Sequence, residues 1–209
     1  MDNYDVLIQS VIDGDESMVV EQTKALLDAG VDPLDIINNG LIAGMNIVGP
    51  RFKDGDMFVP EVLMCAKAMA EGVNIVKPLI ADKDMPTKGK IIIGTVKGDL
   101  HDIGKNLVAM MMESGGYTVV NLGIDIAPEK FVEAAKAENT DIVAMSSLLT
   151  TSMPSMKATV DVIKKSGLKV KCIVGGAPVS QKFSDDIGAD GYSPDAGSAV
   201  ELCARLIGA

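Results

Sequence analysis

Residues 91–104, IIIGTVKGDLHDIG, join an apolar run typical of a buried strand to a loop that carries the chain's one histidine, His101. We predict a strand over Ile91–Val96 and a helix that begins at about Lys105. A histidine on a loop at the carboxyl end of a strand lies where open α/β sheets bind their ligands. Asp99 can hold one ring nitrogen of His101, so that the other nitrogen is free to bind a metal. The alternative is that the two side chains only hydrogen-bond within their own turn.

The residues after this loop repeat the same alternation of apolar strand patterns and amphipathic helix patterns. Further strands are predicted at 119–122, 142–146 and 170–174, with a short one near 191–192 and a closing helix from about 196 to 207. Repeated β-α units imply a parallel sheet that is covered by helices on both faces. We therefore expect an α/β fold with a flavodoxin-like (Rossmann-type) parallel sheet and the strand order 2-1-3-4-5.

The first part of the chain carries only helical patterns. Apolar residues recur at spacings of three and four throughout residues 4–80, and turn signals such as Gly14-Asp15 interrupt them. Four helices joined by short turns predict a small N-terminal four-helix bundle. The stretch Asp82–Gly89 is charged, contains a proline and lacks periodicity. We place the domain boundary there, with a helical domain over 1–88 and an α/β domain over 89–209.

The composition argues against several classes of partner. The net charge is −10 without a basic cluster, aromatic residues make up 3% and tryptophan is absent, so we expect neither nucleic acid nor an anionic membrane as a partner. Three widely spaced cysteines, Cys65, Cys172 and Cys203, fit buried, reduced thiols rather than disulfides or a zinc site. The sequence shows no signal-peptide core and no apolar run of membrane-spanning length, so we expect a cytoplasmic protein.

Polar or glycine-rich loops follow three of the predicted strands, and in a parallel sheet the carboxyl ends of the strands share one edge. The loops carry Asp99-x-His101-x-x-Gly104, then Ser146-x-Leu148 with Thr150 and Ser152, then Gly175-Gly176. Their side chains and glycines can therefore converge on one ligand, because glycine admits close backbone approach and hydroxyls satisfy polar ligand atoms. Structural alternatives exist: Ser146 and Ser152 can be strand-end and N-cap hydroxyls, and Gly175-Gly176 can be a tight turn.

Together, the three motifs at this spacing resemble the signature of methyltransferase-type cobalamin (corrinoid) binding proteins. The Asp-x-His-x-x-Gly, Ser-x-Leu and Gly-Gly elements are matched by Asp99, His101, Gly104, Ser146, Leu148, Gly175 and Gly176. Residues 56–62, DMFVPEV, resemble that family's helical cap, so the resemblance spans nearly the whole chain. The chain is similar to the stand-alone corrinoid proteins of methylamine, methanol, betaine and methoxyaromatic methyltransferase systems, and to the cobalamin module of methionine synthase.

The resemblance implies a bound cobalamin, as methylcobalamin, cob(I)alamin or a related corrinoid, whose benzimidazole tail is detached from the cobalt. His101 would be the lower axial metal ligand. With Asp99 and Ser152 it would form a relay that takes up or releases a proton as the methylated and Co(I) states alternate.

The resemblance also implies further contacts with the cofactor. The loop residues against the corrin and its tail would be Gly98, Leu100, Asp102, Ile103 and Gly104. The residues around the nucleotide tail would be Ser146, Leu148, Thr150, Gly175, Gly176, Ala177 and Ala196. From the cap, Phe58 and the helix through Cys65 and Met69 would cover the upper face. As an alternative, Phe58 and Cys65 are plain core residues.

The function implied is that of a methyl carrier rather than a complete enzyme. A substrate-specific methyltransferase would load the cofactor, and a methylcorrinoid:acceptor methyltransferase would pass the methyl group to tetrahydrofolate or coenzyme M. A reductive activase would act on Co(II). The cap would move aside for these partners, with Asp82–Gly89 as the hinge.

Three alternatives compete with the methyl carrier. One is the cobalamin-binding subunit of an adenosylcobalamin mutase, which usually lacks a helical cap, so residues 1–81 count against it. Another is a cobalamin sensor module, which generally carries an output domain for which this chain leaves no length. The third, a flavodoxin-like domain without a corrinoid, would leave the spacing of the three motifs to chance.

Overall fold

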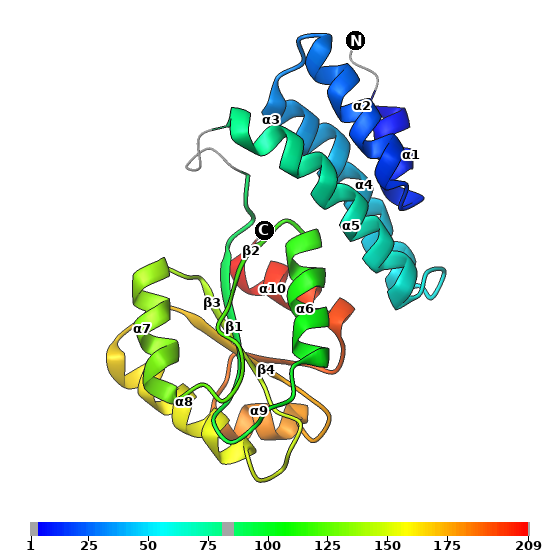
Figure 1. The fold of residues 1–209 in the computed structure, drawn as a ribbon. Helices are drawn as coiled ribbons and strands as arrows, with labels where there is room; N and C mark the ends of the chain where they lie inside the picture. The colour runs from blue at the N-terminus through cyan, green and yellow to red at the C-terminus, as the bar shows by residue number, and fades with distance from the viewer. Residues whose placement is uncertain (1–3, 81–85, 209) are drawn as a thin grey trace. The chain divides into compact units, whose positions relative to one another are not determined.

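The computed structural model describes residues 4–80 and 86–208, and the chain divides into two compact units (Figure 1). The boundary lies between Thr87 and Lys88, except that Ser114–Gly116 group with the first unit. The first unit is helical and the second is α/β. Part of the predicted linker, residues 82–85, lies outside the described residues.

The helical unit is built from four long helical segments, as the sequence predicts. The segments are α1 (Asp5–Ile12), α2 (Glu16–Asp28), the continuous run α3 (Pro33–Asp35), η1 (Ile36–Leu41) and α4 (Ile42–Lys53), and α5 (Val59–Val76), which continues into η2 (Lys77–Leu79). Side chains cap three of the starts: Asp15 accepts from the Met18 amide, Asp32 accepts from the Leu34 amide, and Glu61 accepts from the Phe58 amide. One helical segment differs from the prediction: η1 is a π-helix, which the sequence pattern does not indicate.

The α/β unit is a five-stranded parallel sheet, and its strand order β2-β1-β3-β4-β5 confirms the prediction. The strands are β1 (Lys90–Thr95), β2 (Thr118–Asn121), β3 (Ile142–Ser146), β4 (Lys171–Gly175) and β5 (Gly191–Ser193). The helices are α6 (Ile103–Ser114), α7 (Pro128–Glu138), α8 (Met153–Ser166), α9 (Gln181–Ile187) and α10 (Ala196–Ile207).

Helices lie on both faces of this sheet (Figure 1), and apolar side chains pack between each layer of helices and the strands. On one face, Ile92 of β1 packs in a cluster with Phe131 of α7 and Val160 of α8. On the other face, Ile91 belongs to a cluster with residues of α6 and α10, such as Met112. The central strands are therefore buried from both sides, and only the ends of the sheet are left for loops that bind a ligand.

Helix α6 begins at Ile103, two residues earlier than predicted. Its first turn is closed by the Asn106 amide, which donates to the Asp102 carbonyl at 2.8 Å. Ile103 and Gly104 therefore lie in the first helical turn, and the loop after β1, which we call the His101 loop, comprises only residues 96–102.

The three cysteines are buried and unpaired, as the sequence predicts. Within residues 4–80 and 86–208, no helix combines the length and the apolar character needed to cross a bilayer.

Candidate functional site

The His101 loop opens with a tight turn at the carboxyl end of β1. The Asp99 amide donates to the Val96 carbonyl at 3.2 Å, and Gly98, the third residue of the turn, has φ = 87°. A type II turn requires such a positive φ at this position, which favours glycine. After the turn the chain returns to β1, where the hydroxyl of Thr95 donates to the carbonyl of His101 at 2.8 Å.

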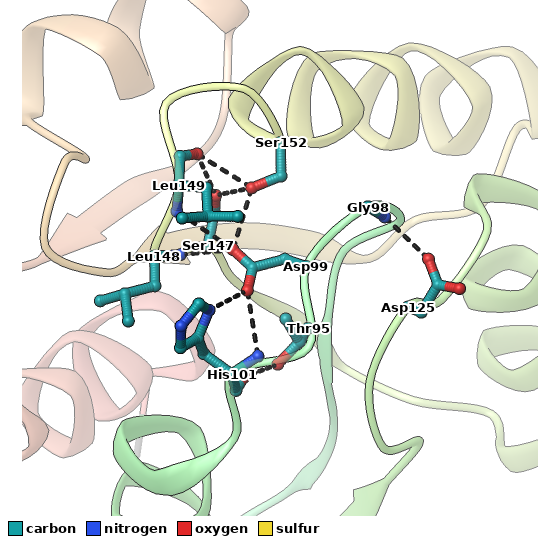
Figure 2. A network of polar contacts seen from close by, with 9 residues as sticks. All are labelled: Thr95, Gly98, Asp99, His101, Asp125, Ser147, Leu148, Leu149 and Ser152. Carbon is teal, nitrogen blue, oxygen red and sulfur yellow. Dashed lines mark hydrogen bonds and ion pairs between the residues drawn. The ribbon is translucent and has the colours of Figure 1, made fainter.

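Asp99 is the centre of the site, and its side chain is completely buried (Figure 2). Its Oδ1 accepts from the backbone amide of His101 at 3.0 Å and lies 2.7 Å from the Nδ1 atom of the same residue. Its Oδ2 accepts from the amides of Leu148 and Leu149, at 2.7 and 3.1 Å, and from the hydroxyl of Ser152 at 2.9 Å. One carboxylate thus joins the His101 loop to the loop after β3.

These hydrogen bonds keep Asp99 ionised. Burial alone would raise the pKa of its carboxyl group, but the bonds from His101, Leu148 and Ser152 outweigh burial and hold the pKa well below its usual range. Because an ionised carboxylate can only accept, Nδ1 of His101 must carry the proton in this contact. In the neutral ring, Nε2 then offers its lone pair to a ligand.

The loop after β3, residues 147–152, which we call the serine loop, places two buried hydroxyls behind Asp99. The hydroxyl oxygens of Ser147 and Ser152 lie 2.7 Å apart, and Ser152 donates to Asp99. Ser152 is the N-cap residue of α8, but its hydroxyl makes no capping bond to the helix. The alternative of a plain N-cap hydroxyl is therefore wrong for Ser152.

The glycine pair at the end of β4, Gly175 and Gly176, lies against the backbone of the serine loop. A Cβ atom on Gly176 would lie 1.9 Å from the carbonyl oxygen of Ser147, so only glycine fits there. The Ser147 amide also donates to the Gly175 carbonyl at 3.2 Å. The glycines therefore do not only form a tight turn: Gly176 also allows the backbone after β4 to approach the backbone of the serine loop.

The front of the site combines a half-exposed imidazole with exposed apolar side chains. The side chain of His101 is 51% exposed, and within the described residues no hydrogen bond reaches its Nε2 atom. Leu100 and Ile103, on either side of it in sequence, are 69% and 87% exposed, and Leu148 and Leu149 are also exposed. A Cβ atom on Gly104 would meet only open space. An oriented metal ligand beside open apolar surface fits a large, mainly apolar group that carries a metal ion.

Comparison with known proteins agrees with this geometry. A family model described as "B12 binding domain" matches residues 89–201, and a second model with the same description matches residues 4–77. A corrinoid protein of Desulfitobacterium hafniense (strain Y51) is 44% identical, with 100% of this chain and 99% of that protein covered. The chain belongs to the methyltransferase-type corrinoid proteins, which bind cobalamin.

Two further relatives extend the comparison. Trimethylamine corrinoid protein 2 of Methanosarcina acetivorans is 44% identical, with 91% of this chain and 90% of that protein covered. The crystal structure of the methanol:cobalamin methyltransferase complex MtaBC from Methanosarcina barkeri matches with a TM-score of 0.90 and 32% identity, covering 98% of this chain and 79% of that one.

The structure brings some of the predicted site residues of this corrinoid protein together in one network and leaves others outside it. Asp99, His101, Ser152 and the backbone of Leu148 share the network (Figure 2). The predicted residues of the α/β unit for which the structure gives no hydrogen bond to Asp99 or His101 are Gly98, Leu100, Asp102, Ile103, Gly104, Ser146, Thr150, Gly175, Gly176, Ala177 and Ala196. Among the predicted cap residues, Phe58 is 68% exposed, whereas Cys65 is buried and donates to the Ile12 carbonyl within the helical unit. Cys65 is therefore a core residue.

The sequence analysis did not predict two buried polar residues near the site, Ser147 and Lys105. Ser147 follows directly after the strand, and only its position next to Ser146 signals it. Lys105 is buried with its Nζ atom donating to Asn106 at 2.6 Å and to Asn121 at 2.7 Å. Burial lowers the pKa of Lys105, and the charge of Asp102 opposes this shift. The lysine ties the first turn of α6 to the end of β2, a role that no sequence pattern reveals.

Proposed function

We propose that this corrinoid protein is a methyl carrier in which His101 is the lower axial ligand of the cobalt. The observation that carries the proposal is the asymmetry of the imidazole: Nδ1 is held by the buried carboxylate of Asp99, whereas within the described residues no hydrogen bond reaches Nε2 of this half-exposed side chain. A carboxylate on the far side of a metal-binding imidazole fixes its tautomer and raises its basicity.

Bound cobalamin supplies a cobalt ion that takes up a methyl group from a donor and gives it to an acceptor. The residues of the chain orient the axial ligand and control its proton. Asp99 holds the proton on Nδ1 of His101, and Ser152 donates to the other carboxylate oxygen. If His101 were released from a bound metal, this chain of hydrogen bonds could take up a proton, and it could give the proton up again on rebinding.

The names of the relatives support a methyltransferase partner. They include trimethylamine and dimethylamine corrinoid proteins, and the solved complex is a methanol:cobalamin methyltransferase. We infer that one methyltransferase loads this chain from a small methylated compound and that another delivers the methyl group to tetrahydrofolate or coenzyme M. A reductive activase would restore the carrier if the cobalt were oxidised to Co(II).

The similarity to corrinoid proteins includes the helical unit: a B12-binding family model matches residues 4–77, and the Desulfitobacterium relative aligns over the whole chain. This favours a methyl carrier over a mutase subunit or a sensor module. In the proposal, residues 1–88 form the cap and 89–209 bind the cofactor, with Phe58 covering the upper face. The nucleotide tail lies among the predicted residues Ser146, Leu148, Thr150, Gly175, Gly176, Ala177 and Ala196.

The test compares wild type with His101→Ala after loading both with cobalamin. The visible spectrum of the wild type should show an axial nitrogen from the protein, and the variant should lose that signature. Added free imidazole should restore it, which serves as the control that only the ligand is missing. The methylated wild type should also transfer its methyl group when an acceptor methyltransferase is added. An unchanged cobalt spectrum in His101→Ala would contradict the proposal.

A further inference from the structure

The His101 loop has a second support, on the side away from the serine loop. This support is the β2–α7 loop, residues 122–127. It runs beside the end of β1: the Thr95 amide donates to the Gly123 carbonyl at 3.0 Å, and the Ile126 amide donates to the Thr95 carbonyl at 2.9 Å. Val96 and Ile126 form a parallel bridge. The loop therefore continues the pairing of the sheet past the end of β2.

Asp125 extends this pairing onto the His101 loop with two further bonds, of which Figure 2 shows the one to Gly98. Its carboxylate accepts from the Gly98 amide at 2.7 Å, and its own amide donates to the Asp99 carbonyl at 3.1 Å. Gly98 is the residue of the opening turn that has a positive φ. The bond within that turn uses the Asp99 amide, and the Gly98 amide donates instead to Asp125, which lies outside the turn. Asp125 thus binds the backbone of two consecutive residues, Gly98 and Asp99, which precede His101 by three and two positions.

The backbone of Asp125 adopts an unusual conformation to make these bonds. Its φ is 54°, a left-handed value that residues other than glycine, asparagine and aspartate adopt rarely. In the described chain only one other residue that is not glycine, Asn139, has a positive φ, and Asn139 ends α7 as its C-cap. A C-cap in this conformation is an ordinary helix ending, whereas Asp125 uses it to reach a loop.

We propose that Asp125 is a positioning residue that keeps Asp99 and His101 in the geometry needed for axial ligation, an inference that rests on the proposed function. Asp99 is held by its carboxylate from the serine loop and by its backbone carbonyl from Asp125. The two supports act on opposite sides of the same residue. Without the Asp125 carboxylate, the Gly98 amide loses its acceptor and the turn keeps its bond from the Asp99 amide to the Val96 carbonyl, so the imidazole of His101 would be held less firmly in the orientation that a metal requires.

Three substitutions separate the contributions of Asp125. Asp125→Ala removes the acceptor and disfavours the left-handed backbone, Asp125→Gly removes the acceptor but permits that backbone, and Asp125→Asn keeps both an acceptor oxygen and the backbone preference. Asn139→Ala is the matched control, because it perturbs the other left-handed residue far from the loop in sequence. Thermal unfolding of all four variants shows how much stability each has lost.

Two measurements give the outcome. In the protein without cofactor, hydrogen exchange at the Gly98 amide should become about tenfold faster in Asp125→Ala and Asp125→Gly, and stay near wild type in Asp125→Asn and Asn139→Ala. In the cobalamin-loaded protein, the visible spectrum should show a smaller His101-ligated fraction in the first two variants, with affinity about tenfold weaker. Asp125→Asn should restore both.

The results separate the two proposals. Wild-type protein that binds cobalamin without a His101 signature would overturn the proposed function. A wild-type signature that persists unchanged in both Asp125→Ala and Asp125→Gly would overturn only the role of Asp125. A loss of the same size in Asn139→Ala would also overturn it, because the effect would then be one of general stability.

Discussion

At both ends of the parallel sheet, aspartate carboxylates accept hydrogen bonds from backbone amides. The two ends differ in what else the carboxylates bind, and this difference indicates which end carries the functional site. At the amino end, Asp141 accepts from the Lys90 amide at 2.8 Å. In the same way Asp190 accepts from the Cys172 amide at 2.8 Å and from the Nζ atom of Lys171 at 3.0 Å. These carboxylates bind only the strands beside them, so their bonds tie the sheet together.

At the carboxyl end, Asp99 also accepts backbone amides, but it binds an imidazole as well. Within the described residues no hydrogen bond reaches the second nitrogen of that imidazole, and exposed Leu100 and Ile103 flank His101 in sequence. The same type of side chain thus ties strands together at one end of the sheet, whereas at the other end we propose that it prepares an imidazole to bind the cofactor's metal. Loss of a carboxylate should affect stability at both ends, but cobalamin binding at only one.

The largest contrast is expected between Asp99→Ala and Asp190→Ala. Asp99→Ala leaves several buried donors without an acceptor and should lower the free energy of unfolding by about 3 kcal/mol, whereas Asp190→Ala should lower it by about 1 kcal/mol. Cobalamin affinity should fall roughly 10–100-fold in Asp99→Ala and stay unchanged in Asp190→Ala. Denaturant titration and equilibrium binding measure the two effects. Equal affinities in the two variants would remove the distinction between the ends of the sheet.

The second contrast is between the stabilities of wild type and Asp99→Asn as the pH is lowered. The pKa of Asp99 in the folded protein lies below its unfolded value of about 3.9, so its carboxylate stabilises the fold fully above that value. This stabilisation is lost as the pH falls through the folded pKa. Wild type should therefore exceed Asp99→Asn in stability by a constant margin from about pH 7 to pH 5, and the margin should shrink below about pH 4. Unfolding titrations at each pH measure the margin; one that grew as the pH fell would refute the depressed pKa.

The smallest contrast compares two serines at opposite ends of helix α8. Ser152 donates to Asp99, whereas Ser166 donates to the Ile163 carbonyl within the helix. Each alanine substitution should lower stability by about 1 kcal/mol. Only Ser152→Ala should also change the fraction of cobalamin that is ligated by His101, which the visible spectrum reports. A matching spectral change in Ser166→Ala would mean that α8 as a whole, rather than the hydroxyl of Ser152, controls the ligand.

The fold and the centre of the site could be predicted from the sequence, because their signals are local or periodic. Apolar runs separated by helical patterns indicate a parallel sheet, for which the flavodoxin-like strand order is a common topology, and Asp99 and His101 lie two residues apart. The predicted start of α6 is too late, because Gly104 resembles a loop residue. Glycine is tolerated in the first turn of a helix, where its Cβ position faces open space.

The rest of the site depends on tertiary contacts that leave no pattern in the sequence. The amides of Leu148 and Leu149 are backbone groups, which every residue but proline carries. Asp125 looks like any acidic turn residue until the β2–α7 loop is placed beside the His101 loop. Lys105 is of a type that is usually exposed, and only the oxygens of two asparagines make its burial possible.

The most direct test of axial ligation uses the fact that His101 is the only histidine. Protein grown with ¹⁵N-histidine carries the label at that one residue, and it is loaded with cobalamin and reduced to Co(II). An axial nitrogen splits the electron paramagnetic resonance lines of the cobalt. We predict that this splitting changes from the triplet of ¹⁴N to the doublet of ¹⁵N in the labelled protein. A triplet that persists would show that the nitrogen belongs to the cofactor's own benzimidazole, and axial ligation by His101 would be contradicted.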